Sequence, residues 1–227
     1  MWEMHRDYLA ATHPLNYIFW ECTLKCNFFC RHFGIRAGVN DKDTTELTTM
    51  EIKNTFQHIA EKMDASKIMI AITGGEPLIR ADLFEVMSFA HELGFNWGMV
   101  TNGYLIDANV IEHMISSGMS TIDISIDGIG DTHEVFRGVP GSYARAVAGV
   151  KALARAKFLK ILRVSTTINK SNFHQLEEMK KLVFSWGASA WRLIEIDPIG
   201  RAQDNKELLL SRKQSIELLN FVKTSRK

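Results

Sequence analysis

Residues 67–77 read KIMIAITGGEP, an apolar run that ends in two glycines, a glutamate and a proline. A short run of apolar residues that does not alternate with polar ones is typical of a strand covered on both faces. A helical pattern follows at residues 81–93, and a second apolar run, NWGMVT, occupies residues 96–101. This order predicts two parallel strands joined by a right-handed helical crossover.

The same alternation continues in both directions along the chain. We expect further strands at residues 16–20, 121–126, 159–168 and 190–196, and further helices at residues 48–62, 107–117, 142–156, 172–186 and 211–224. Six β-then-α units of this kind predict an α/β fold with helices outside a parallel sheet. Such a sheet either stays open as a doubly wound fold or curls toward a barrel.

Small and polar residues follow each expected strand. In chain order the segments are ECTLKC, GGEP, NG, DG, NKSN and DPIGR. Because the carboxyl ends of parallel strands meet at one edge of the sheet, we expect these loops to contribute to one shared site.

Composition excludes several classes of protein. The chain has 227 residues, of which 46% are hydrophobic and 23% charged, which excludes disordered, collagen-like and coiled-coil proteins. With 27 basic and 26 acidic residues, its charge does not indicate a nucleic-acid partner. No apolar run reaches the ~18–20 residues of a membrane helix, and the N-terminus lacks the pattern of a secretory signal. We therefore expect a cytoplasmic protein with neither a membrane nor a nucleic acid as partner.

Three cysteines, Cys22, Cys26 and Cys30, lie within nine residues, and the chain has no others. A secreted disulfide framework normally spreads its cysteines along the chain, whereas a tight cluster in a reducing compartment indicates a metal or iron–sulfur site. Structural zinc usually needs a second pair of ligands, which this sequence lacks. Three thiolates would leave a four-iron cluster with one iron open to a substrate or cofactor. The alternative is a set of small buried core residues.

We call residues 22–34, CTLKCNFFCRHFG, the cysteine loop. Together with GGEP, with TNG at residues 101–103 and with SIDG at residues 125–128, this loop resembles the radical S-adenosylmethionine (radical SAM) superfamily. The resemblance spans residues 16–202 and points to the subgroup that carries a C-terminal SPASM extension and acts on peptides, proteins or cofactor precursors. It implies a partial (β/α)6 TIM-like barrel of parallel strands with helices outside. It also implies a [4Fe–4S] cluster and S-adenosylmethionine (SAM) as cofactors, and a one-electron donor such as a flavodoxin or ferredoxin. The implied enzyme cleaves SAM reductively to a 5′-deoxyadenosyl radical, which abstracts hydrogen from a substrate.

The family's CxxxCxxC motif aligns with CNFFCRHF at residues 26–33. Cys26 and Cys30 then take the first two cluster-ligand positions, and Phe33, which has no donor atom, takes the third. A second alignment uses Cys22, Cys26 and Cys30, which keeps three thiolates but widens the last gap by one residue. Asn27 and His32 also fit the family pattern around the missing cysteine in the first alignment, which we therefore prefer.

The resemblance also assigns residues to SAM. One motif of the family contacts the amino group of SAM through its backbone, and this motif matches Gly74, Gly75, Glu76 and Pro77. Of these, Glu76 is expected to brace the loop. Ser125 matches a family serine that lies near the ribose or carboxylate of SAM. Arg137 resembles a family arginine that pairs with the carboxylate of SAM, for which a planar guanidinium is well suited. The alternatives are that Ser125 is only a hydroxyl tolerated in a strand and that Arg137 is only a surface charge.

Further residues near the expected strand ends have two interpretations each. Asn102 and Asp127 either line the substrate side or cap a turn or helix. Phe28 and Phe29 either shield a cluster from water or belong to the core. His133 shows no metal-binding spacing and is expected to be solvated or satisfied by hydrogen bonds.

For the domains, we expect an N-terminal extension at residues 1–15 and a radical SAM core at residues 16–227, with the SPASM extension absent because no cysteine follows Cys30. The first function hypothesis is a radical SAM enzyme. The second is a degenerate member that binds SAM or a peptide without catalysis, because Phe33 leaves the ligand set incomplete. The third is a zinc or iron thiolate protein that kept only the fold.

Overall fold

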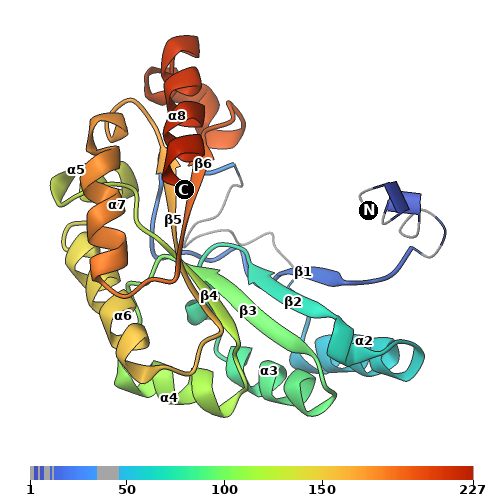
Figure 1. The fold of residues 1–227 in the computed structure, drawn as a ribbon. Helices are drawn as coiled ribbons and strands as arrows, with labels where there is room; N and C mark the ends of the chain where they lie inside the picture. Colours follow the sequence, from blue (N-terminus) through green and yellow to red (C-terminus); the bar gives the residue numbers. More distant parts are fainter. Residues whose placement is uncertain (1–2, 5, 8–10, 12, 35–45, 227) are drawn as a thin grey trace.

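The computed structural model describes residues 3–4, 6–7, 11, 13–34 and 46–226. Its centre is a six-stranded sheet of parallel neighbours in the order β1-β2-β3-β4-β5-β6 (Figure 1). The strands are β1 (Tyr17–Glu21), β2 (Met69–Thr73), β3 (Asn96–Thr101), β4 (Thr121–Ser125), β5 (Ile161–Ile168) and β6 (Ala190–Glu195). β1 and β6 are the two edges and do not pair with each other in the described chain, so the sheet is a partial barrel, as predicted.

Helices lie along the outer side of the curved sheet (Figure 1). They are α2 (Thr49–Lys62), α3 (Leu83–Glu92), α4 (Ala108–Ser116), α5 (Asp131–Arg137), α6 (Ser142–Ala156), α7 (Leu176–Ser185) and α8 (Arg212–Ser225). All the helices expected from the sequence are present, with slightly different ends. α5 was not expected, because seven residues between two glycines are too short to show a helical period.

Local sequence explains where two of these helices begin. Thr48 accepts a hydrogen bond from the backbone of Glu51, whose side chain bonds back to Thr48, and Ser211 and Gln214 form the same reciprocal pair before α8. Such capping boxes satisfy backbone N–H groups that a helix leaves unpaired at its start.

The strands bury only one of their two faces completely. On the helix side, residues such as Ile70, Ile72 and Trp97 are fully buried in the main core. On the inner side, Tyr17 and Phe19 of β1 remain 57% and 73% exposed. The expectation of strands covered on both faces is therefore correct only toward the helices, because an open barrel leaves its lumen accessible.

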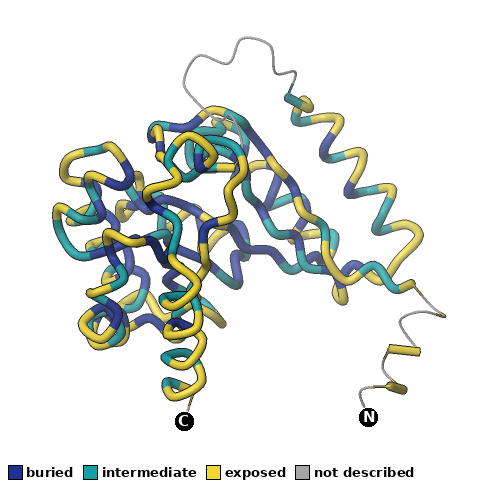
Figure 2. The backbone as a smooth tube through the Cα atoms, turned by 90° about the horizontal axis from the view of Figure 1, so that it is seen from above, coloured by how far each residue is buried: buried dark blue, intermediate teal, exposed yellow. Residues whose placement is uncertain are grey.

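The last helix, α8, covers the outside of the barrel. It is mostly exposed or half-buried (Figure 2), and its buried residue, Leu218, packs with Ile168 and Leu176. Phe221 of α8 meets Trp191 of β6 edge-on, at 6.1 Å between ring centroids. Among the described helices, none combines the length and the apolar character that crossing a bilayer requires.

Candidate functional site

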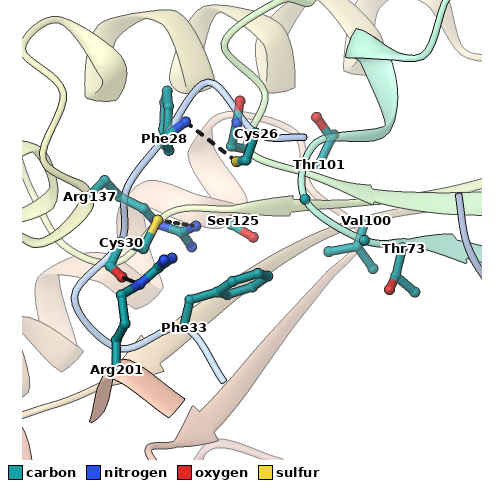
Figure 3. Close-up of a pocket in the computed structure, with 13 residues that line it drawn as sticks. Cys26, Phe28, Cys30, Phe33, Thr73, Val100, Thr101, Ser125, Arg137 and Arg201 are labelled. Carbon is teal, nitrogen blue, oxygen red and sulfur yellow. Dashed lines mark hydrogen bonds between the residues drawn. The ribbon is translucent and has the colours of Figure 1, made fainter. Parts of the chain in front are cut away.

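A cavity of about 290 Å³ lies at the carboxyl ends of the central strands (Figure 3). We call it the mouth cavity. Of the residues predicted from the sequence, it brings together Cys26, Cys30, Gly74, Gly75, Ser125 and Arg137. These come from the loops after β1 and β2, the end of β4 and the end of α5. The predicted sharing of one site by separate loops is thus observed.

The two glycines let the cysteine loop lie directly against the loop after β2. Gly75 N donates to Thr23 O at 2.7 Å, and Glu76 N donates to Lys25 O at 2.9 Å. A Cβ added at Gly74 would lie 2.3 Å from Thr23 O, and one at Gly75 would lie 2.1 Å from Lys25 O. Both distances are impossible for a side chain, so this close approach requires glycine. From the sequence, these glycines were expected to bring the backbone close to a ligand. In the structure they bring it close to the cysteine loop.

Glu76 and Pro77 do not line the mouth cavity. Glu76 is fully buried, and its carboxylate accepts hydrogen bonds from Thr101 Oγ1 at 2.7 Å, Asn102 N at 2.8 Å and Leu78 N at 3.2 Å. Burial raises the pKa of Glu76, and the same hydrogen bonds oppose that rise. Pro77 begins a short 3-10 helix, Pro77–Ile79. Glu76 thus braces one loop against the next, as expected.

Asn102 combines both roles considered from the sequence. It lines the mouth cavity, and its Oδ1 accepts from Tyr104 N at 2.9 Å, which forms a turn. Its Nδ2 donates to Asn27 Oδ1 at 2.7 Å. The side chain therefore ties the loop after β3 to the cysteine loop.

Cys26 and Cys30 are free, buried thiols that face the mouth cavity. Cys26 Sγ accepts from Phe28 N at 3.4 Å. Burial raises the pKa of Cys26 to about 11. Because metals bind the thiolate, cluster binding here would release protons.

Cys22 lies elsewhere. It is 2% exposed within the main core, its backbone N donates to Thr73 O at 3.0 Å, and burial raises its pKa to about 12. It does not line the mouth cavity. This placement favours the alignment that uses Cys26, Cys30 and position 33.

Arg137 is buried beside Cys30, which excludes the alternative of a surface charge. Its Nη1 donates to Cys30 Sγ at 3.6 Å (Figure 3), and its Nε donates to Asp127 Oδ2. Although burial raises the pKa of Asp127, the charge of Arg137 holds it below its usual range. A fixed guanidinium at this point favours any anion in the mouth cavity, whether a thiolate or a carboxylate.

Asp127 acts behind the cavity rather than in its lining. Its Oδ1 accepts from Thr167 N at 2.7 Å, and its own N donates to His133 Nδ1 at 3.0 Å. These contacts fix both Asp127 and the guanidinium that it holds. Neither interpretation describes Asp127, because its side chain lies outside the cavity lining and binds Arg137 and the backbone of β5 instead of capping α5.

Two histidines near this pair, His32 and His133, are held in surroundings that lower their pKa. His133 is satisfied at Nδ1 only, and its Nε2 has no hydrogen-bond partner among the described residues. Burial lowers the pKa of His133 to about 4, and likewise that of His32. His32 stacks on Phe136, with ring centroids 4.3 Å apart. From the sequence, His32 was only a match to the family pattern and His133 was expected to be solvated or hydrogen-bonded. The burial of both was not expected, because it depends on the helix α5.

The segment after β6 reaches back to the cysteine loop. Arg201 Nε donates to Cys30 O at 2.7 Å, and its guanidinium lies 4.2 Å from the ring centroid of Phe29. Arg201 N donates to Phe33 O at 3.0 Å, and a Cβ at Gly200 would meet that same oxygen at 2.6 Å. The sequence indicated only that residues 198–201 lie near the mouth, not that they hold the loop around Phe33.

The three phenylalanines of the cysteine loop lie in different surroundings. Phe28 is buried and lines the mouth cavity together with Phe33, whereas Phe29 is 68% exposed outside it. Phe28 and Phe33 form an apolar wall beside the thiols. Among the described residues, no group of three or more His, Cys, Asp or Glu side chains could hold a metal ion.

Comparison with known proteins identifies the family. Residues 20–183 match the family model described as the Radical SAM superfamily. The chain belongs to this superfamily. Radical SAM proteins bind a [4Fe–4S] cluster and SAM, and these are the cofactors that the family assigns to the chain.

Curated relatives carry enzyme names. The AdoMet-dependent heme synthase of Methanosarcina barkeri is 32% identical over 201 residues, covering 88% of this chain and 56% of that protein. The mycofactocin maturase MftC of Mycobacterium tuberculosis (strain CDC 1551) is 31% identical over 188 residues, covering 82% and 46%. The chain thus spans about half the length of the curated relatives it matches.

The fold has solved counterparts. The crystal structure of Streptococcus suis SuiB bound to S-adenosylmethionine aligns with a TM-score of 0.72 at 15% identity, covering 99% of this chain and 52% of that one. At this identity the likeness establishes the fold alone.

The donor set of this chain fits the family's cluster at two of its three thiolate positions. Cys26 and Cys30 face the mouth cavity, while Phe33 presents an apolar ring there. Thr73, Gly74 and Gly75 line the same cavity as the two thiols, whereas Glu76 and Pro77 do not.

Proposed function

We propose that this chain is the core of a radical SAM enzyme that acts on a cofactor precursor or a peptide. The observation that supports the proposal is the convergence of two buried thiols, a glycine bend and the buried Arg137 on one cavity. In this family the cluster supplies the electron that cleaves SAM into methionine and a 5′-deoxyadenosyl radical. One domain at residues 16–227, with an extension at residues 1–15, and a cytoplasmic location with a flavodoxin or ferredoxin as donor belong to the same proposal.

The chain's own residues would bind and position these cofactors. Cys26 and Cys30 would ligate the cluster, and the segment Gly74–Pro77 would present its backbone to the amino group of SAM. Arg137, held by Asp127, would pair with the carboxylate.

Further lining residues would position SAM and exclude water. Ser125 would contact the ribose or carboxylate of SAM. Phe28 and Phe33 would keep water from the site.

The substrate classes come from the relatives. Those that match over most of this chain include heme synthases, a pre-heme d1 synthase and mycofactocin maturases, and SuiB was crystallised with the precursor peptide SuiA. A cofactor precursor or a peptide is therefore the substrate that we propose.

The decisive experiment compares the unmodified chain with Phe33→Cys after anaerobic reconstitution with iron and sulfide. We expect the wild-type chain to bind SAM by calorimetry and to form 5′-deoxyadenosine with dithionite. Phe33→Cys should raise both cluster content and turnover several-fold, because it restores a third thiolate. Iron and sulfide counts and chromatography of the nucleoside products measure these quantities.

Two variants control for the choice of ligands. Cys26→Ser should abolish cluster absorption, whereas Cys22→Ser should leave it nearly unchanged, since Cys22 lies outside the mouth cavity. SAM binding without any 5′-deoxyadenosine in wild type and Phe33→Cys alike would overturn the catalytic proposal and leave a SAM-binding protein.

A further inference from the structure

Below the mouth cavity, the inner face of the barrel encloses a second cavity of about 350 Å³, which we call the lumen cavity. Thr73 and Val100 line both cavities, so the two adjoin. A molecule in the lumen cavity would therefore lie next to the site of SAM, where a substrate has to lie.

One wall of the lumen cavity carries more positive than negative charge. Arg163 Nη1 and Arg192 Nη1 each lie 3.4 Å from the same oxygen, Oδ2 of Asp123. Among the described residues, neither guanidinium has a further hydrogen bond or ion pair. Since each guanidinium has five N–H donors, the single carboxylate leaves most of them unused.

Asp123, the acidic residue of this wall, is itself buried, and burial raises its pKa. The Ser165 hydroxyl, which is not part of the lining, opposes that rise as a hydrogen-bond donor. Strand register sets these neighbours, because Asp123 pairs with Arg163 on β5 and Ser165 of the same strand pairs with Arg192 on β6. A single buried carboxylate therefore faces two guanidinium groups, which leaves N–H donors for a further anionic group.

Another part of the lining is apolar and aromatic. Tyr17 and Phe19 of β1 line the lumen cavity and stack on each other, with ring centroids 5.8 Å apart and planes 23° apart. Both rings are largely exposed, although large aromatic residues usually contribute to stability by burial. An aromatic face and a cationic face in one cavity suit a ligand with a flat apolar body and a negatively charged substituent.

We propose that Arg163 and Arg192 bind a carboxylate group of the substrate while Tyr17 and Phe19 receive its flat apolar body. Before the substrate arrives, the two guanidinium groups share the single carboxylate of Asp123, which then competes with the carboxylate of the substrate. Arginine forks match carboxylates through paired N–H donors, which gives orientation as well as affinity. The inference rests on the proposed function only in treating the lumen cavity as the substrate site.

A fluorescent pair of probes tests this directly. Pyrene-1-carboxylate has a flat apolar body with one carboxylate, and pyrene-1-methanol is its neutral counterpart. Binding of each to the full chain is measured by fluorescence anisotropy at low and high salt. Arg192→Gln should weaken the carboxylate about tenfold, as loss of a charge-assisted hydrogen bond does, and should change the neutral probe little. Arg155→Gln, an exposed change on α6, is the matched control.

The opposite substitution gives an independent readout. Asp123→Asn removes the internal carboxylate that competes for the two arginines, so it should tighten pyrene-1-carboxylate binding while Arg192→Gln weakens it. A merely structural ion pair would not produce this opposite pair of effects. Equal changes for both probes, or no change for either, would overturn the proposal.

Two further measurements separate the possible outcomes. A capped phenylalanine–aspartate–phenylalanine peptide carries the same chemistry on a peptide, and tighter binding of the peptide or of the pyrene acid identifies the source of the carboxylate. SAM affinity of the wild-type chain, measured by calorimetry without probe, tests the proposed function by itself. Loss of the arginine-dependent selectivity with intact SAM binding would therefore count against the lumen site alone.

Discussion

The mouth cavity and the lumen cavity adjoin, but they are built differently. Around the mouth cavity, backbone groups join one loop to another, as between Gly75 and Thr23, and a buried carboxylate, Glu76, links two loops. In the lumen cavity, side chains such as Arg163 and Arg192 meet Asp123 at 3.4 Å and stay partly exposed. The shape of the mouth cavity thus depends largely on contacts between loop backbones, whereas the substrate contacts that we propose in the lumen cavity would be made by a few side chains.

The largest effect is expected where backbone meets backbone. Gly75→Ala places a Cβ 2.1 Å from Lys25 O, so the cysteine loop has to move away. We expect a loss of about 3 kcal/mol or more in unfolding free energy, together with loss of iron on reconstitution. Denaturant unfolding and iron counts measure both.

Gly141→Ala is the matched control for this substitution. Gly141 has φ +75°, but its added Cβ would meet nothing within 4 Å. It should therefore cost only about 1 kcal/mol, the conformational part of the effect. Equal losses for the two variants would show that the contact between the loops is not what holds the mouth cavity.

A smaller effect, dependent on pH, is expected from the buried His133. Its pKa is lowered from 6.5 to about 4 by burial, so between these values the unfolded chain binds more protons than the folded one. Stability due to this histidine is therefore present above pH 6.5 and is lost as the pH falls toward 4, by roughly 3 kcal/mol in all. Urea unfolding at pH 7 and pH 5 measures the loss.

His133→Gln should reduce this pH dependence, while the exposed His174→Gln should keep it. An unchanged pH slope in His133→Gln would mean that the histidine behind the mouth cavity is accessible to water. The hydrogen-bonded surroundings of Asp127 and Arg137 would then be less closed to water than the structure indicates.

The smallest effect on stability is expected in the lumen cavity. Arg163→Gln removes an ion pair at 3.4 Å whose arginine is 27% exposed. Thermal unfolding should report a change within about 1 kcal/mol, because partly exposed pairs stabilise little. A large loss of stability would show that the lumen wall is part of the structural framework and not a replaceable specificity element.

The sequence determined the succession of strands and helices, since apolar runs and helical periods are local signals. It also placed the loops that carry Cys26, Cys30 and Gly74 near one another, because parallel strands bring their carboxyl ends to one edge, whereas only the family resemblance assigned Arg137 to the same site. Local pattern failed at α5, which is too short to show a period and whose position buries His133 and Arg137.

Only the tertiary structure decided which cysteines share a cavity. Cys22 is turned into the core, although it lies four residues from Cys26, because it continues from β1 and bonds to Thr73. Only the structure showed that the glycines accommodate the cysteine loop, and that Asp123 and two arginines from other strands meet in the lumen. Such contacts depend on strand register and curvature, which arise from packing between distant segments and leave no pattern in the local sequence.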